Sequence, residues 1–143
     1  MKIVISGSLD FTEEIKKTSN VLKELGHEVI IPKTSEDIIN GSVSLEQIMK
    51  EKSDGSIVDR AMNLDIIRYY FNEIKNADAV LVLNIDKKNV KNYIGGATFM
   101  EMSFAHVLGK KLFLINDVPD MHYTDEIRIM QPAVLNGDLE KIE

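Results

Sequence analysis

Short runs of consecutive apolar residues alternate along the chain with longer segments in which apolar residues recur every three or four positions. The runs are rich in Ile, Val and Leu and predict buried strands at residues 3–6, 29–32, 79–83, 112–115 and 133–135. The periodic segments predict helices at residues 13–25, 45–52, 57–76, 98–108 and 124–130. This alternation predicts one α/β domain, residues 1–143, with a mainly parallel five-stranded sheet between two helical layers: a flavodoxin- or Rossmann-like three-layer sandwich.

Three of the predicted helices carry further signals. Ser44 is a suitable N-cap for the helix over residues 45–52. Residues 57–76 predict one long helix whose apolar side chains face the core, namely Met62, Ile66, Ile67, Tyr70 and Ile74. Thr98 and Glu101 have the spacing of a capping box at the start of the helix over residues 98–108.

Composition narrows the function classes. The net charge of −6 argues against a nucleic-acid polymer or an anionic membrane as partner, because both attract basic proteins. There is no cysteine, and His27, His106 and His122 lack metal-ligand spacing, so no metal or redox cofactor is expected. The apolar run at the N-terminus is too short for a signal peptide or a membrane span, which predicts a cytoplasmic protein.

Ligands of parallel α/β sheets bind beyond the carboxyl ends of the strands. The loops that begin at Gly7, Asn84 and Asn116 are therefore expected to form the site. The first loop, Ser6–Gly7–Ser8–Leu9–Asp10, offers hydroxyl groups and backbone amides to a phosphate or a sugar, although it equally suits an ordinary strand-to-helix turn. It lacks the glycine pattern of a dinucleotide site and the lysine of a triphosphate site.

The segment from Gly95 to Glu101 is a second candidate. Gly95 and Gly96 let the backbone approach a ligand closely, and the helix that Thr98 opens presents its N-terminal amides to negative charge. Glu101 either bonds the Thr98 amide as a capping residue or faces the same cavity as a nucleophile or base. Spacing alone leaves both interpretations open.

Aromatic and basic residues elsewhere also have two interpretations. Tyr69 and Tyr70 either pack against the core or line a pocket for a nucleobase. A basic loop either is solvated surface or guides an anionic nucleotide; it contains Lys87, Lys88 and Lys91.

Three segments of the chain resemble the nucleoside 2-deoxyribosyltransferase-like superfamily, which includes deoxynucleoside 5′-monophosphate N-glycosidases. They are residues 5–8, residues 76–84, and the stretch Gly96–Ala97–Thr98–Phe99–Met100–Glu101 with its continuation to residue 111. The resemblance implies that Glu101 attacks the anomeric carbon of the sugar and displaces the base, and that water or a second base resolves the covalent glycosyl-enzyme. It also implies sugar or phosphate contacts from Gly7 and Ser8, and a place for Asn84 at the mouth of the third strand. In such enzymes a neighbouring subunit completes the site, which implies a homodimer or larger homo-oligomer.

Two positions depart from the family's pattern. Tyr70 and Gly95 stand where family enzymes carry aspartates, which leaves protonation of the base and orientation of the sugar without clear residues. Asp65, more than one helical turn before Tyr70, is the substitute carboxylate and the second catalytic candidate. The Gly95–Glu101 segment is also similar to the glycine-rich motif of the lysine-decarboxylase-like phosphoribohydrolases, which points to the same type of bond.

These features predict an enzyme that cleaves or transfers the N-glycosidic bond of a (deoxy)nucleoside or its 5′-monophosphate. The missing aspartates favour an alternative, a non-catalytic nucleotide-binding or sensing domain on the same scaffold. A flavodoxin-like redox domain is a weaker third hypothesis, because the chain has no tryptophan and little aromatic material near the loops to hold a flavin.

Overall fold

The computed structural model describes all 143 residues of the chain. Its strands form one five-stranded sheet in which every neighbouring pair is parallel, in the order β2-β1-β3-β4-β5. The strands are β1 Lys2–Ser6, β2 Glu28–Ile30, β3 Ala79–Val82, β4 Lys111–Leu114 and β5 Ala133–Val134. Each strand overlaps one of the predicted apolar runs, so the predicted parallel sheet is confirmed.

Helices occupy most of the segments between the strands. The α-helices are α1 Thr12–Glu24, α2 Lys33–Ile39, α3 Leu45–Asp54, α4 Ile57–Asn63, α5 Ile66–Lys75, α6 Gly96–Val107 and α7 Thr124–Ile129. Two 3₁₀ helices, η1 Leu9–Phe11 and η2 Leu139–Lys141, complete the elements. The helix predicted at residues 45–52 is confirmed as α3, with the Ser44 hydroxyl accepting a hydrogen bond from the Gln47 amide.

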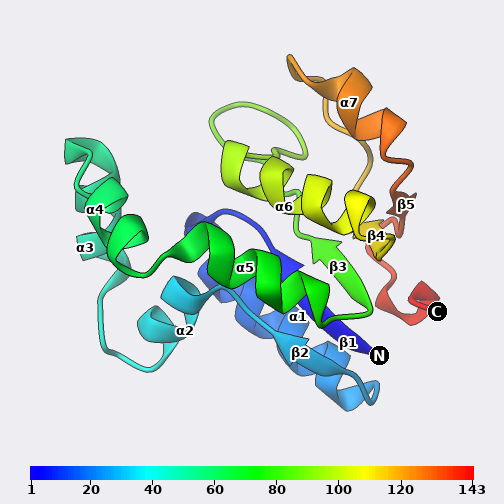
Figure 1. Cartoon of the computed structure of the whole chain (residues 1–143), viewed down its shortest axis with the longest axis horizontal. Coiled ribbons are helices and arrows are strands. Elements are labelled where there is room, and N and C mark those ends of the chain that lie inside the picture. The colour runs from blue at the N-terminus through cyan, green and yellow to red at the C-terminus, as the bar shows by residue number, and fades with distance from the viewer.

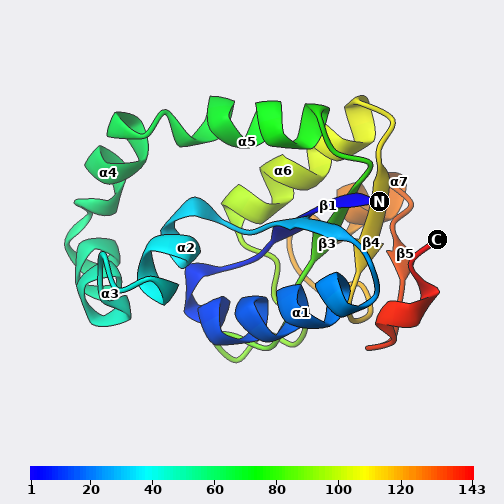
Figure 2. The same ribbon diagram turned by 90° about the horizontal axis from the view of Figure 1, so that it is seen from below.

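The sheet lies between two helical layers, as predicted for a three-layer α/β sandwich (Figure 2). Successive residues of β1 point to opposite faces because side chains alternate along a strand. Ile5 joins the apolar cluster under α1, together with Ile15. Val4 joins the cluster that α5, α6 and α7 cover, together with Met102.

The single helix predicted over residues 57–76 is wrong. The helix is interrupted at Asp65, whose φ of 46° lies in the left-handed region. Helix α4 ends before this residue and α5 begins directly after it. Two residues expected in the core are instead exposed, Met62 by 71% and Ile67 by 52%, whereas Tyr70 and Ile74 are buried as expected. Helix α2 follows Pro32 in a polar segment for which no helix is predicted.

The break in the helix shapes the end of the molecule that holds the site. From β1 the chain runs to the edge strand β2 and then returns to β3 on the other side of β1, so the strand order reverses between β1 and β3. Figure 1 shows α3 and α4 standing apart from the sheet, as an arm between α2 and α5. Because α4 turns away from α5, its side chains line the same cavity as the loop after β1 rather than continuing along the sheet.

Candidate functional site

Ser6 and Glu101 meet at the carboxyl end of β1. Ser6 follows Ile5, so strand alternation turns its side chain to the face that carries α6. The Ser6 hydroxyl is fully buried and donates a hydrogen bond to Oε2 of Glu101. A strand end and a helix 95 residues away in sequence are thereby joined by one polar contact.

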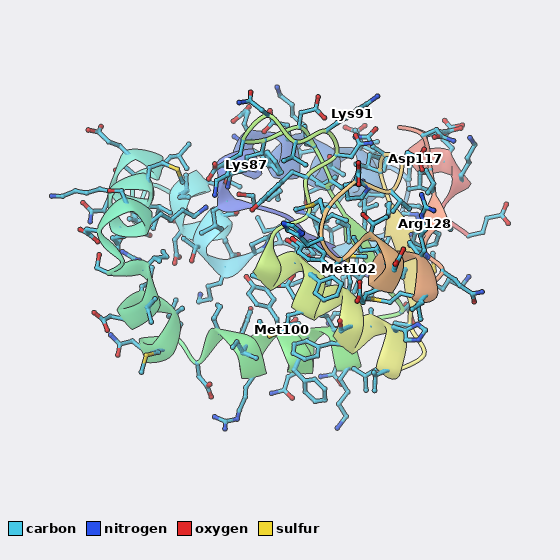
Figure 3. The ribbon with its side chains drawn as sticks, turned by 90° about the horizontal axis from the view of Figure 1, so that it is seen from above. Lys87, Lys91, Met100, Met102, Asp117 and Arg128 are labelled. Carbon is cyan, nitrogen blue, oxygen red and sulfur yellow. The ribbon has the colours of Figure 1, made fainter.

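Helix α6 presents Glu101 through its periodicity. Ala97, Met100, Glu101 and Phe104 are spaced by three or four residues, and all four line one cavity. Figure 3 shows Met100 on the side of α6 toward α5, while Met102 packs on the sheet side. Glu101 therefore projects from the face of α6 that leaves the core, into a space bounded by α5 and α4.

The predicted capping box is wrong. Helix α6 begins at Gly96 with Gly95 as N-cap, so Thr98 lies inside the first turn and is buried. No side chain caps this helix, and the carboxylate of Glu101 bonds Ser6 instead of the Thr98 amide. Of the two interpretations of Glu101, the geometry therefore favours the cavity-facing one.

The cavity in front of Glu101 is small and largely apolar. Its volume is about 170 Å³. Its walls come from the loop after β1, the start of α2, helices α4 and α5, and α6. The lining residues are Gly7, Leu9, Pro32, Thr34, Ile57, Arg60, Ala61, Leu64, Ile66, Ile67, Tyr70, Ala97, Met100, Glu101 and Phe104. A cavity of roughly 150 Å³ accommodates a benzene ring, so this space suits one planar heteroaromatic ring system.

A second, polar cavity of about 640 Å³ adjoins the first, and the two share Gly7, Leu9, Ile57 and Ala97. Its volume lies in the range of small-molecule sites. Residues of the loop after β1, α3, the loop after β3 and the start of α6 line it. They are Gly7, Ser8, Leu9, Asp10, Met49, Lys52, Ser53, Ile57, Lys87, Lys88, Tyr93, Gly95, Gly96, Ala97 and Thr98.

An ion network organises this polar cavity. Asp10 pairs with Lys52 and with Lys87, each at 2.9 Å, and Lys87 also donates a hydrogen bond to the Ser8 hydroxyl at 2.7 Å. Burial alone would raise the pKa of Asp10, but the two lysines outweigh it and hold that pKa below its usual value. Lys88 is exposed and has no ion partner. Three lysines therefore face one aspartate, and the cavity has an excess of positive charge.

The loop after β3 holds Lys87 and Lys88 in place. Lys87 pairs with Val90 across a tight turn whose two central residues, Lys88 and Asn89, have left-handed φ angles of 53° and 59°. Both lysines lie over the Tyr93 ring, with Nζ 5.4 and 5.9 Å from its centroid. In Figure 3 Lys87 lies toward the arm of α3 and α4, whereas Lys91 lies on the outer side of the loop.

The surroundings of Glu101 disfavour its charge. Burial raises the pKa of Glu101 to about 7, although the hydrogen bond from Ser6 acts in the opposite direction. The residue as a whole is half-buried by surface area and lines the cavity. A carboxyl group that titrates near neutral pH in a cavity is a typical candidate for nucleophile or general base.

Most of the residues predicted for the site come together. Gly7, Leu9, Tyr70 and Glu101 line the apolar cavity, and Ser8, Gly95, Gly96 and Thr98 line the polar one. Ser6 lies beneath Glu101.

Two predicted residues lie elsewhere. The side chain of Asp65 is exposed by 61%, pairs with Arg68 at 3.2 Å and lines neither cavity. Asn84 is fully buried, and its amide group bonds the backbone of Asn116 and Asp117, which ties the loop after β3 to the loop after β4. We assign Asn84 a structural role, and Asp65 is not positioned to act with Glu101.

Some lining residues carry no signal in the sequence. Lys52 and Met49 come from α3, and Ile57, Arg60 and Ala61 come from α4. Arg60 forms a bidentate ion pair with Glu51 that connects α4 to α3. Nε lies 2.9 Å from Oε1 of Glu51, and Nη2 lies 2.9 Å from Oε2. No local pattern marks these residues, because their role depends on the helix break, which sets α3 and α4 on the same cavities as the loop after β1.

No group of three or more histidine, aspartate or glutamate side chains is arranged to hold a metal ion. None of the helices has the length and apolar character needed to cross a membrane. Comparison of the chain with protein-family models, curated proteins and solved structures found no match. The residues that line the two cavities are therefore the basis for a functional assignment.

Proposed function

We propose that this protein cleaves or transfers the N-glycosidic bond of a (deoxy)nucleoside 5′-monophosphate or of the corresponding nucleoside, with Glu101 as nucleophile. One observation carries the proposal: a carboxylate held by Ser6 at the edge of an apolar, ring-sized cavity, directly beside a larger basic cavity. This arrangement matches a nucleotide, in which the sugar joins an apolar aromatic base to an anionic phosphate.

The apolar cavity is the proposed base site. Its walls of Leu, Ile, Ala, Met and Phe side chains offer stacking and exclusion of water, and only a few polar groups are present to orient a ring. The carboxylate of Glu101 lies at this cavity, where it would face the carbon that joins the sugar to the base. Attack there forms a glycosyl ester and breaks the bond to the base nitrogen, which takes the electron pair.

The basic cavity favours the 5′-monophosphate over the free nucleoside. Three lysines against one aspartate leave two positive charges in excess, which matches the charge of about −2 on a phosphate monoester near neutral pH. Gly96 and Ala97, in the first turn of α6, line the same cavity, so backbone amides add to the attraction for an anion. Lys87 and Ser8 already form one side of such a site.

The experiment incubates the purified protein with a panel of nucleosides and 5′-monophosphates and follows released base by liquid chromatography. Parallel reactions with a second free base distinguish transfer from hydrolysis. We expect base release that is abolished in Glu101→Gln, whose side-chain carbonyl can still accept the Ser6 hydrogen bond. The matched control is Glu14→Gln, an exposed residue of α1 on the other side of the sheet. Full activity in Glu101→Gln would exclude Glu101 as nucleophile.

A non-catalytic nucleotide-binding domain is the second candidate. Glu101 is the only carboxylate that lines the apolar cavity, and Asp10, the only one that lines the polar cavity, is paired with two lysines. A sensor would raise its thermal unfolding temperature with nucleotides yet release no base. Thermal unfolding and chromatography on the same samples separate the two functions.

A further inference from the structure

Departure of a nucleobase poses a chemical problem that Glu101 does not solve. When the bond to the sugar breaks, the base nitrogen receives the electron pair, and negative charge spreads over the ring. A hydrogen-bond donor aimed at the ring lowers the energy of that state, and donors fixed in advance are the most effective. The polar side chains that line the apolar cavity beside Glu101 are Thr34, Arg60 and Tyr70.

Tyr70 is the donor whose hydroxyl is held in position and whose hydroxyl hydrogen has no acceptor within the chain. The residue is 93% buried, and its hydroxyl oxygen accepts a hydrogen bond from the Lys33 amide at 2.5 Å. No group of the chain accepts the proton of this hydroxyl. By contrast, Arg60 is occupied by Glu51 through two of its nitrogen atoms.

The protein also keeps Tyr70 protonated. Burial, followed by the negative charge of Glu101, raises the pKa of Tyr70 far above its ordinary value of 10. The hydroxyl is therefore a permanent donor at any working pH and does not ionise during turnover. It stabilises the departing base by hydrogen bonding, and the base takes its proton from water.

We propose that Tyr70 is a catalytic residue whose hydroxyl donates a hydrogen bond to the leaving base, while Glu101 attacks the sugar carbon. This role rests on the proposed function. The Glu101 oxygen bonds the anomeric carbon, and the base leaves as an anion with the electron pair of the broken bond. The base then takes a proton from water. The hydroxide formed in that step, or a further water, opens the glycosyl ester. The products are free base, sugar or sugar phosphate, and regenerated carboxylate.

The experiment compares two leaving groups in the wild type and in Tyr70→Phe, which removes only the hydroxyl. The pair is chosen from the bases that the wild type releases: a purine and its N7-methylated form, or uracil and 5-fluorouracil. The activated base of each pair leaves more easily and depends less on a donor. We expect Tyr70→Phe to slow release of the ordinary base by about 100-fold and release of the activated base by less than about 5-fold.

Matched variants separate a catalytic from a structural role. Tyr69→Phe removes a neighbouring hydroxyl that lines neither cavity, and it should leave both rates unchanged. Lys33→Pro removes the amide that positions the Tyr70 hydroxyl; Lys33 is the first residue of α2, where proline is tolerated. It should lower release of the ordinary base more than release of the activated base, and it tests the role even if Tyr70→Phe unfolds.

Equal losses for both leaving groups in Tyr70→Phe or in Lys33→Pro would overturn the assignment, because a positioning effect on the cavity slows both alike. An unchanged rate in Tyr70→Phe would also overturn it. Absence of base release from every substrate by the wild type refutes the proposed function itself. That result differs from failure of the Tyr70 assignment alone, in which the wild type is active.

Discussion

Glu101→Gln is expected to abolish activity and at the same time to stabilise the protein, in a manner that depends on pH. Burial holds the Glu101 carboxyl at a pKa of about 7, against an ordinary value of 4.5. Between these two pH values the unfolded chain ionises at this position and the native chain does not. The native state therefore binds more protons than the unfolded state, and its stability falls as pH rises through this window.

The size of this effect follows from the two pKa values. A difference from 4.5 to about 7 corresponds to roughly 3 kcal/mol, at about 1.4 kcal/mol per unit of pKa. The stabilising contribution of the neutral carboxyl is fully present below pH 4.5 and is lost by the time pH exceeds 7. The residue is only half-buried by surface area, and screening by solvent reduces the loss, so about 3 kcal/mol is an upper limit. Glutamine is neutral at every pH, keeps the shape of the side chain and avoids the loss.

The assay is urea denaturation of the wild type and of Glu101→Gln at pH 5 and at pH 8. The two proteins should have similar free energies of unfolding at pH 5, and the variant should be more stable by about 2–3 kcal/mol at pH 8. Glu14→Gln, on the exposed surface of α1, should match the wild type at both pH values. A stability difference between Glu101→Gln and the wild type that is the same at pH 5 and pH 8 would refute the argument, since only a titrating buried carboxyl produces the change.

Three further predictions concern two residues of the site and one residue outside it. Ser6→Ala removes the donor that lowers the pKa of Glu101, so the rising limb of the pH–rate profile, expected near pH 7, should move to higher pH; an unmoved limb would contradict this. Lys87→Ala should reduce kcat/KM by about 10-fold for a 5′-monophosphate and little for the nucleoside, whereas Lys91→Ala, on the outer side of the loop, should change neither. Asp65→Asn should keep full activity and change the free energy of unfolding by less than about 1 kcal/mol, because its exposed pair with Arg68 contributes little; a large loss of activity would restore Asp65 as a catalytic candidate.

The sheet could be predicted from the sequence because its signal is local. Each strand contains at least two consecutive apolar residues, and a strand covered on both faces requires such residues wherever it pairs. Residues 79–82 are all buried, and they form the strand predicted from the apolar run at 79–83. The loop at Gly7 could be predicted because it follows the carboxyl end of the first strand, where ligands of parallel sheets bind. The order of the strands places the ends of β1 and β3 side by side.

The broken helix could not be predicted in the same way. Residues on both sides of Asp65 keep helical spacing, and the break depends on one residue that adopts a left-handed φ without being glycine. Aspartate tolerates this conformation better than most residues, but nothing in its neighbours marks it. The mistaken helix had a further consequence. It placed Asp65 on the same helix as Tyr70, more than one turn earlier, whereas in the structure Asp65 is exposed at the break and paired with Arg68.

The contribution of α3 to the polar cavity could not be predicted for a related reason. Lys52 lies on α3 in a segment of charged residues whose ordinary interpretation is a solvated surface, and only the fold shows that it shares Asp10 with Lys87. These three residues come from three separate segments, so no spacing in the sequence connects them. The sequence pattern predicts the ends of the strands and the existence of α3, but it does not predict where α3 and α4 lie relative to those ends. Because α3 and α4 line the cavities and contain no strand of the sheet, we expect substitutions in these helices to change ligand binding without altering the sheet.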